Sequence, residues 1–327
     1  MAYYLKIVST GIAVPEKILS NQDLEKMVDT SDEWIMTRTG IRERRISAPG
    51  VASSDLGTEA ALETLNSAGI STQDVELILV ATASSDHLFP STACVIQKNL
   101  QAVRATAFDI SAACSGFLYG MTVAESLMRA GHYRNALIIG TETLTKITDY
   151  KDRSTCVLFG DGAGAMLVTL GNDKSGLFSS HLGSDGKFTD LLNLPAGGSR
   201  LPATFETIKE HQHYIKMEGN ELFKVAVRAM EEAAHLTLKK AGLTTADVDL
   251  LIPHQANMRI INSLVKRLGI SQDRVYINID RYGNTSAASI PIAYHEARNQ
   301  GLLNKDSNIL MVAFGGGITW GGVLVRG

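Results

Sequence analysis

The chain has 327 residues, of which 45% are hydrophobic and 20% are charged, and its formal net charge is −3 at pH 7. These values are typical of a globular protein and exclude a disordered or fibrous chain. The small negative charge provides no overall basic field for binding nucleic acid. The length is sufficient for two domains of ordinary size or for one large domain.

Cysteine usage and the start of the chain bear on its compartment. The three cysteines, Cys94, Cys114 and Cys156, are widely spaced and form no CxxC or Cys/His zinc pattern. A disulfide framework is therefore not expected, which favours a reducing compartment. Residues 1–16 do not resemble a signal peptide, and no apolar run is long enough to span a membrane. We expect a cytoplasmic protein that binds neither nucleic acid nor membranes.

Strands and helices are predicted to alternate along the chain. Apolar runs with little polar alternation predict buried strands at 77–83, 136–140, 165–170, 249–253 and 308–314. Helical stretches lie between them, at 53–68, 91–100, 113–130, 219–241, 257–268 and 286–300. This alternation predicts a layered α/β fold.

The two halves of the chain carry similar segments in the same order. "AGISTQDVELILVATAS" begins at Ala68, and "AGLTTADVDLLIPHQAN" begins 173 residues later, at Ala241. Downstream, "AFDISAACSG" (107–116) and "NIDRYGNTSAAS" (278–289) each place small residues between a strand and a helix, and a glycine and another strand follow. Each half is therefore predicted to be one copy of the same unit, and a site at their junction can take residues from both.

The repeat defines the expected domains. We expect an N-terminal half at 1–172 and a C-terminal half at 173–327. The C-terminal half is expected to carry an irregular insertion at about 180–217, because "SDGK", "LPAGGSR" and "KEHQHY" are rich in glycine and polar residues.

Cys114 is the first candidate for a chemical role. It lies among small residues in "DISAACSGF", where a strand is predicted to end and a helix to begin. With Ser111 as the N-cap, Cys114 would lie in the first helical turn, where backbone N–H groups and the helix dipole lower the pKa of a thiol. The alternative is a buried structural cysteine, which we expect Cys94 and Cys156 to be.

Two polar residues of the second half occupy related places. His254 ends a predicted strand in "PHQANMR", and Asn284 lies in "YGNTSAAS", the second-half counterpart of the cysteine turn. Taken alone, His254 is better explained as an ordinary surface residue and Asn284 as an ordinary turn residue. "FGGGITWGG" (314–322) allows close approach of backbone N–H groups to a ligand, although it can also be a tight connection. "GDGAGA" precedes a strand, which argues against a phosphate loop, and "HQH" (211–213) is expected to lie in a polar insert.

These segments together resemble the β-ketoacyl-ACP synthase III enzymes of the thiolase superfamily. Cys114 in "AACSGF", His254 in "PHQANMRI" and Asn284 in "YGNTSAAS" match the Cys-His-Asn triad of that family. "EWIMTRTGIRERR", "FGDGAGA", "MEGNELFKVAV" and "FGGGITWGG" also resemble family segments, so the similarity extends from about residue 5 to the C-terminus. The resemblance implies a five-layered αβαβα fold with two pseudo-symmetric halves, and a homodimer.

The resemblance implies a function as well. The expected reaction is the decarboxylative condensation of a short acyl-CoA primer with malonyl-ACP, which gives a 3-oxoacyl-ACP and initiates fatty-acid synthesis. Cys114 would carry the acyl group, while His254 and Asn284 would stabilise the enolate. The backbone N–H groups of Cys114 and Gly316 would form the oxyanion hole. Acyl-CoA and malonyl-ACP would be substrates, and no cofactor is expected.

Further residues are assigned by the same resemblance. The expected CoA and pantetheine site comprises Trp34, Arg38, Arg153, Gly219 and Asn257. Phe89, inserted from the dimer partner, and Phe314 would border the acyl pocket, and the bulk of Phe89 favours a short primer. Acyl carrier protein is acidic, so its expected docking site comprises the basic Lys224, Arg259, Lys266 and Arg267, although these can equally be a solvated helix face.

Three other functions remain open from the sequence. A superfamily relative could use the same triad to condense or transfer acyl groups in secondary metabolism. A cysteine hydrolase could also use Cys, His and Asn, although the repeat and the Gly316 loop argue against it. A non-catalytic acyl-binding protein would not need Cys114.

Overall fold

The computed structural model describes residues 4–172 and 175–327. The first half contains β1 (Tyr4–Ala13), α3 (Ser53–Ala68), β4 (Leu77–Ala81), α4 (Thr92–Leu100), β5 (Thr106–Ile110), α5 (Gly116–Arg129), β6 (Asn135–Thr143) and β7 (Asp161–Gly171). The second half contains β8 (Gly176–Ser184), α8 (Gly219–Lys240), β11 (Leu250–Pro253), α9 (Met258–Leu268), α11 (Ser289–Asn299), β12 (Asn308–Gly315) and β13 (Thr319–Arg326). The helices expected from the sequence are all present, within three residues at each end.

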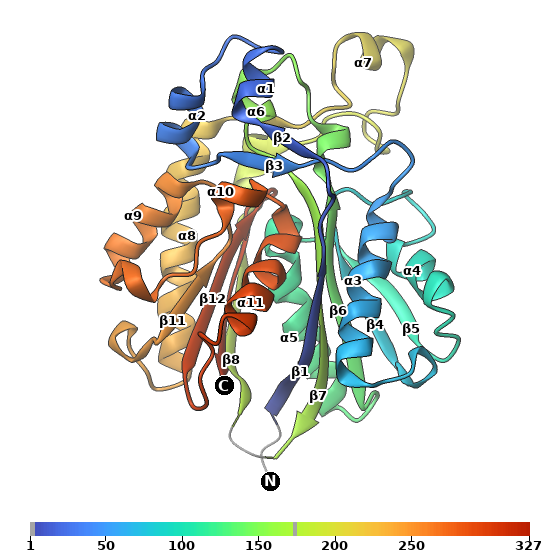
Figure 1. The fold of residues 1–327 in the computed structure, drawn as a ribbon, viewed down its shortest axis with the longest axis vertical. Coiled ribbons are helices and arrows are strands. Elements are labelled where there is room, and N and C mark those ends of the chain that lie inside the picture. Colours follow the sequence, from blue (N-terminus) through green and yellow to red (C-terminus); the bar gives the residue numbers. More distant parts are fainter. Residues whose placement is uncertain (1–3, 173–174) are drawn as a thin grey trace.

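Each half builds one part of a mixed sheet. In the first half the strand order is β5-β4-β6-β7-β1, with β4 parallel to β5 and β6 and antiparallel pairing elsewhere. In the second half the order is β11-β12-β13-β8, and only β11 and β12 are parallel. The two parts join where β1 pairs with β8 at Leu5 and Leu177, and they diverge from that junction (Figure 1).

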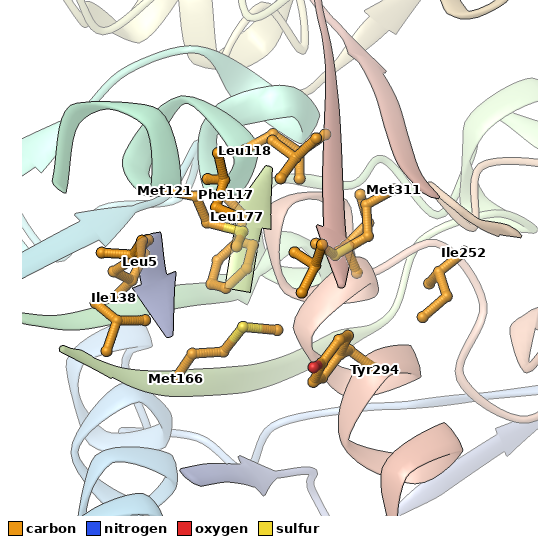
Figure 2. Close-up of a cluster of buried hydrophobic side chains, with 14 of the residues drawn as sticks. Leu5, Phe117, Leu118, Met121, Ile138, Met166, Leu177, Ile252, Tyr294 and Met311 are labelled. Carbon is orange, nitrogen blue, oxygen red and sulfur yellow. The ribbon is translucent and has the colours of Figure 1, made fainter. Parts of the chain in front are cut away.

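Helices cover both faces of each part of the sheet, which gives five layers. α3 and α4 pack outside the first half, and α8 and α9 pack outside the second. α5 and α11 lie in the middle and contact strands of both halves (Figure 1). Their side chains form the central core together with residues of eight strands. Its members include Leu5, Phe117, Met121, Ile138, Met166, Leu177, Ile252, Tyr294 and Met311 (Figure 2). The α/β fold expected from the sequence is thus confirmed.

The elements recur at the offset seen in the sequence. β4 and β11 begin 173 residues apart, as do α5 and α11, and β6 and β12. The short 3₁₀ turns η2 (Ala113–Ser115) and η7 (Ser286–Ala288) occupy equivalent positions before the two central helices. The expected boundary between the halves, at 172/173, adjoins residues 173–174, which lie outside the described residues.

Two connections bear on the sequence prediction: one differs from it, and the other is the tight connection that the sequence left open. The expected insertion at about 180–217 begins instead as a strand, because β8 continues to Ser184 and pairs with β13 along its length. The glycine-rich segment 314–322 is a hairpin turn between β12 and β13, in which Gly317 has φ +72°. Such a φ is accessible to glycine without strain. β8 and β13 complete the sheet of the second half, as β1 and β7 complete that of the first.

Short elements form a cap over one end of the sheets (Figure 1). They are β2 (Ile18–Ser20), α1 (Asn21–Glu25), α2 (Asp32–Thr39), β3 (Glu43–Arg45), η3 (Leu144–Ile147), α6 (Arg153–Cys156), η4 (Gly186–Leu191), β9 (Leu192–Asn193), α7 (Phe205–Lys209), β10 (Lys216–Met217) and α10 (Ile279–Tyr282). The buried Arg44 ties three of these segments together through the carbonyl groups of Leu19 and Val157 and the side chain of Asn21.

The central core predicts the cost of a truncation in α5. Met121 is 0% exposed, so Met121→Ala is expected to lower the free energy of unfolding by about 2–5 kcal/mol. Met27 is 50% exposed, and the matched variant Met27→Ala is expected to cost under about 1 kcal/mol. Denaturant unfolding measures both, and equal losses would contradict the assignment of α5 to the core.

Candidate active site

Cys114 lies in the turn between β5 and α5. α5 begins at Gly116 with Ser115 as its N-cap residue, so Cys114 precedes the helix. The expectation that Ser111 caps this helix is wrong: Ser111 is exposed, and the 3₁₀ turn starts only at Ala113. The turn continues directly into α5, the central helix that contacts strands of both halves.

The β12–β13 hairpin fixes the backbone of the cysteine turn. A Cβ on Gly315 would lie 2.7 Å from the Cys114 backbone nitrogen and 3.0 Å from the Ala112 oxygen. The Thr319 hydroxyl donates to the Ala112 carbonyl at 2.9 Å and accepts a hydrogen bond from Ser115 at 2.7 Å. The two backbones can approach this closely only because residue 315 has no side chain.

Burial controls the acidity of the cysteine. The Cys114 side chain is buried, and burial raises the pKa of its thiol to about 12. The Ser286 side chain and the N–H groups of Cys114 and Gly316 act in the opposite direction. The resting form of Cys114 is therefore the thiol and not the expected thiolate, because desolvation of a charged sulfur outweighs the nearby donors.

His254 lies directly after β11 and is 1% exposed. Its backbone N–H extends the parallel ladder to the Val312 carbonyl, and its Nδ1 lies 2.7 Å from the Ser289 hydroxyl. Burial lowers the pKa of His254 to about 3, so the imidazole is neutral. The hydrogen bond at Nδ1 fixes the ring and leaves Nε2 as the nitrogen available to a ligand.

Asn284 belongs to the segment that leads into η7. Its Oδ1 accepts a hydrogen bond from the Ser286 N–H at 2.8 Å, which leaves the amide nitrogen as the end that can donate to a ligand. The preceding Gly283 has φ +64°, and a Cβ there would lie 2.8 Å from the Leu158 oxygen. A backbone bond from Asn284 N–H to the same carbonyl, 2.9 Å long, holds the loop in place.

One cavity brings the three candidate catalytic residues together. It has a volume of about 820 Å³ and is lined by Cys114, His254, Asn284 and Phe314. Its lining also includes Trp34, Arg38, Gly219, Asn257, Lys224 and Arg259. A smaller cavity of about 180 Å³ adjoins Cys114, Ser286 and Gly316, and its remaining lining is mostly apolar. The cysteine thus borders both the larger cavity, which we call the channel, and the smaller one.

The mouth of the channel carries stacked cationic and aromatic groups. The guanidinium carbon of Arg38 lies 5.2 Å from the centre of the Trp34 ring, and that of Arg153 lies 4.9 Å from it. Asn257 caps α9 by accepting a hydrogen bond from the Arg259 N–H at 2.8 Å. A planar base can stack on such groups.

The expected docking residues divide into two places. Lys224 and Arg259 line the channel, whereas Lys266 and Arg267 lie in the last turn of α9. Lys224 pairs with Glu221, and Arg267 pairs with Glu231, both at 2.7 Å. These contacts are between exposed or half-exposed groups, so they cost little to break when a partner binds.

Other sequence candidates lie outside this site. Phe89 is 85% exposed and lines neither cavity of its own chain. Cys156 is buried as expected, but the expectation that Cys94 is buried is wrong, because it lies on the exposed face of α4. His211 pairs with Asp149 at 2.7 Å. The "GDGAGA" segment is part of β7 and not a phosphate loop.

Sequence reasoning missed three polar residues beside the site. Ser289 holds His254, Ser286 lies beside Cys114, and Glu142 lies at the end of β6, fully buried. The two serines belong to the "NTSAAS" segment, but nothing local distinguishes them from other serines. An acidic residue at the end of an apolar strand was the available signal for Glu142.

Comparisons with known proteins identify the family. A model of 3-oxoacyl-[acyl-carrier-protein (ACP)] synthase III matches residues 108–186, and a model of its C-terminal part matches residues 238–327. The β-ketoacyl-[acyl-carrier-protein] synthase III of Caldanaerobacter subterraneus subsp. tengcongensis is 55% identical over 320 residues, which cover 98% of this chain and 97% of that protein. The chain belongs to the β-ketoacyl-[acyl-carrier-protein] synthase III family.

Solved structures agree with the family assignment. The 3-oxoacyl-[acyl-carrier-protein] synthase III of Aquifex aeolicus VF5 is similar with a TM-score of 0.91 and 49% identity, covering 99% of this chain and 100% of that chain. OleA of Xanthomonas campestris is 20% identical with a TM-score of 0.87, covering 99% of this chain and 98% of that chain, so it shares the fold. The thiolase-like arrangement expected for this synthase III chain is therefore confirmed.

The described residues contain neither a membrane-spanning helix nor a cluster of metal ligands. Among the helices of 4–172 and 175–327, none is long and apolar enough to cross a membrane. The same residues contain no group of three or more His, Cys, Asp or Glu side chains that could hold a metal ion.

The contact at Gly315 predicts the effect of a single methyl group. Gly315→Ala is expected to displace the cysteine turn and to slow acylation of Cys114 about 100-fold, because misplacing a reacting group by about 1 Å has that effect. Gly186 has open space around its Cβ position, so Gly186→Ala is the control and should keep the wild-type rate. An unchanged rate in Gly315→Ala would contradict the importance of this contact.

The buried His254 predicts a pH dependence of stability. The unfolded chain binds a proton at this histidine near pH 6.5, whereas the folded chain does so only near pH 3. Folding is therefore weakened as the pH falls from about 6.5 towards 3, by up to about 1.4 kcal/mol per pH unit. His254→Asn should reduce this slope in denaturant unfolding between pH 6 and pH 4, while a substitution of the exposed His235 by Asn should not. Equal slopes in wild type and His254→Asn would contradict the assignment.

Proposed function

We propose that this protein condenses a short acyl-CoA primer with malonyl-ACP, releasing CoA and CO₂ and forming a 3-oxoacyl-ACP. It is a β-ketoacyl-[acyl-carrier-protein] synthase III, an acyltransferase that initiates fatty-acid synthesis. The observation that carries the proposal is the channel of about 820 Å³ in which Cys114, His254 and Asn284 meet. This channel leads from the Trp34 stack at its mouth to the buried sulfur.

In the first half-reaction, Cys114 is the nucleophile. Its sulfur attacks the thioester carbonyl of the acyl-CoA, and CoA leaves. The N–H groups of Cys114 and Gly316 act on the sulfur, so they lie where they can also bind the oxyanion formed beside it. Each such donor contributes about 3 kcal/mol to transition-state stabilisation. The small apolar cavity beside Cys114 suits a short acyl chain.

In the second half-reaction, His254 and Asn284, which belong to the C-terminal half of the chain, act on malonyl-ACP. His254 Nε2 and the Asn284 amide nitrogen donate hydrogen bonds to the malonyl thioester carbonyl. These bonds stabilise the enolate that forms as CO₂ leaves. A neutral His254 serves this purpose because it donates without bringing a second charge into the buried site. The enolate carbon then attacks the acyl group on Cys114.

The rest of the channel binds the carrier arm. Trp34, Arg38 and Arg153 hold the adenine end of CoA by stacking, and Gly219 and Asn257 lie along the pantetheine arm. Lys224 and Arg259 at the channel, with Lys266 and Arg267 further along α9, offer positive charge to an acidic carrier protein. The enzyme needs no cofactor in this scheme and works in the cytoplasm.

A homodimer explains the exposed phenylalanine of the first half. Leu88 and Phe89 are 83% and 85% exposed, which is unusual for adjacent large apolar side chains. In a dimer, Phe89 of one protomer would enter the acyl pocket of the other. It would join Phe314 as a wall of that pocket and keep the space short.

A second candidate function has one observation in its favour. The priming β-ketosynthase from the R1128 polyketide biosynthetic pathway is 32% identical with a TM-score of 0.91. A starter role in secondary metabolism would use the same triad. The higher identity to synthase III relatives favours fatty-acid initiation, and activity with the carrier protein of fatty-acid synthesis would distinguish the two roles.

The acyl-enzyme provides the direct test. Incubation with a panel of acyl-CoAs, followed by intact-protein mass measurement, is expected to show one acyl adduct per chain. Cys114→Ala should lose the adduct, and Cys94→Ala, which removes an exposed cysteine, should keep it. Absence of an adduct from every acyl-CoA, or its persistence in Cys114→Ala, would contradict the proposal. The relative rates across the panel give the preferred primer.

A further inference from the structure

A buried carboxylate lies near the nucleophile and has no part in the steps above. Glu142, in β6, is 0% exposed. It accepts hydrogen bonds from the Ala83 N–H at 3.1 Å and the Ser84 hydroxyl at 2.5 Å in the first half, and from the Ala287 N–H at 3.4 Å in the second. All these partners are donors, which favours the ionised form, while burial raises its pKa.

Ser286 lies beside both Glu142 and Cys114. It is 2% exposed, it lines the small cavity together with Cys114, and its φ is +46°. Its hydroxyl makes no hydrogen bond of normal geometry, yet it is close enough to lower the pKa of both neighbours. A buried hydroxyl without a regular partner and a strained backbone both cost free energy, and such costs concentrate at functional sites.

The backbone conformation at Ser286, in the turn η7, does not require the serine hydroxyl. Ala113, 173 residues earlier, occupies the equivalent position in the cysteine turn and has nearly the same φ, +45°. An alanine therefore suffices for this conformation. The Ser286 hydroxyl needs a different explanation, and its two neighbours supply one.

We propose that Ser286 and Glu142 form a proton relay for the Cys114 thiol. As the sulfur attacks the acyl-CoA carbonyl, the S–H bond breaks and an S–C bond forms. Ser286 Oγ takes the thiol proton and passes its own proton to a Glu142 oxygen. CoA leaves as a thiolate that takes a proton from water. Ser286 shares the small cavity with Cys114 and would exchange the proton with the sulfur directly. Glu142 acts only through Ser286 and is therefore a positioning residue.

The relay returns the proton in the second half-reaction. When the enolate carbon forms its bond to the acyl carbonyl, the S–C bond of Cys114 breaks and leaves a thiolate. Glu142 then gives its proton back through Ser286, so the free enzyme is restored. The acyl chemistry in this scheme rests on the proposed function.

His254 is a poorer acceptor for this proton. Its Nδ1 is already occupied by the Ser289 hydroxyl, and burial lowers its pKa to about 3. Burial shifts the pKa of Glu142 in the opposite direction, upwards, which makes the carboxylate the better base of the two. This division leaves His254 free to serve as a donor to the enolate.

The test measures thiol reactivity without any acyl substrate. Alkylation of Cys114 by iodoacetamide is followed by intact-protein mass between pH 6 and pH 10, in a Cys94→Ala background. Ser286→Ala and Glu142→Gln are expected to slow alkylation at pH 7 by at least about tenfold, since general bases contribute about 10²–10⁴-fold. The difference should shrink towards pH 10, where hydroxide takes the proton.

A purely electrostatic role for Glu142 predicts the opposite result. Its charge raises the pKa of Cys114, so Glu142→Gln would then alkylate faster than wild type. Faster alkylation, or an equal slowing at every pH, would overturn the relay. Glu142→Asp keeps a carboxylate and should react faster at pH 7 than Glu142→Gln; equal rates would also overturn it.

A matched control comes from another serine beside a buried carboxylate. The Ser47 side chain lies next to Asp161, and Ser47 lines neither cavity. Ser47→Ala should keep the wild-type alkylation profile, and a loss as large as that in Ser286→Ala would overturn the proposal.

Since alkylation needs no acyl-CoA, a protein with the expected pH profile but no acyl adduct would refute the proposed function and retain the relay. If the protein forms an acyl adduct but Ser286→Ala and Glu142→Gln keep the wild-type pH profile, the relay is refuted and the proposed function is retained.

Discussion

The site depends on close backbone packing where the two halves meet. Glycines in the central strands make this possible: a Cβ on Gly140 would lie 2.3 Å from the Ala287 oxygen, and one on Gly315 would lie 2.7 Å from the Cys114 nitrogen. Each of these strands therefore presses on one of the two 3₁₀ turns. Packed backbones deform little, so Cys114 from one half and His254 and Asn284 from the other are held at fixed separations.

Burial then decides which groups carry charge. The same desolvation that raises the pKa of Cys114 lowers the pKa of His254, so both side chains rest in neutral forms. A site of this kind works by placing neutral donors where negative charge develops, rather than by holding permanent charges. In the proposed relay, Glu142 is the place to which the thiol proton goes, which connects the electrostatics of the cysteine to that carboxylate.

Much of the fold and of the candidate site was predictable, because the sequence repeats similar segments at a fixed offset. The α3 range of 53–68 and the order of strands and helices follow from local patterns, and His254 and Asn284 follow from family motifs. β8 was missed because it has no long apolar run, and its pairing with β13 is a long-range contact. The acidity of Cys114 was misjudged because burial is a tertiary property. Glu142 and Ser286 come together only in the folded chain.

The stacked mouth of the channel has a practical consequence for optical spectroscopy. Trp34 and Trp320 are the two tryptophans of the chain. Trp34 lies against two guanidinium groups at the channel, whereas Trp320 lies in β13 beside Gly183 and lines neither cavity. A ligand base that stacks at the mouth changes the surroundings of Trp34 and leaves Trp320 as an internal reference. Under the proposed function, the protein therefore carries its own fluorescent reporter of CoA binding.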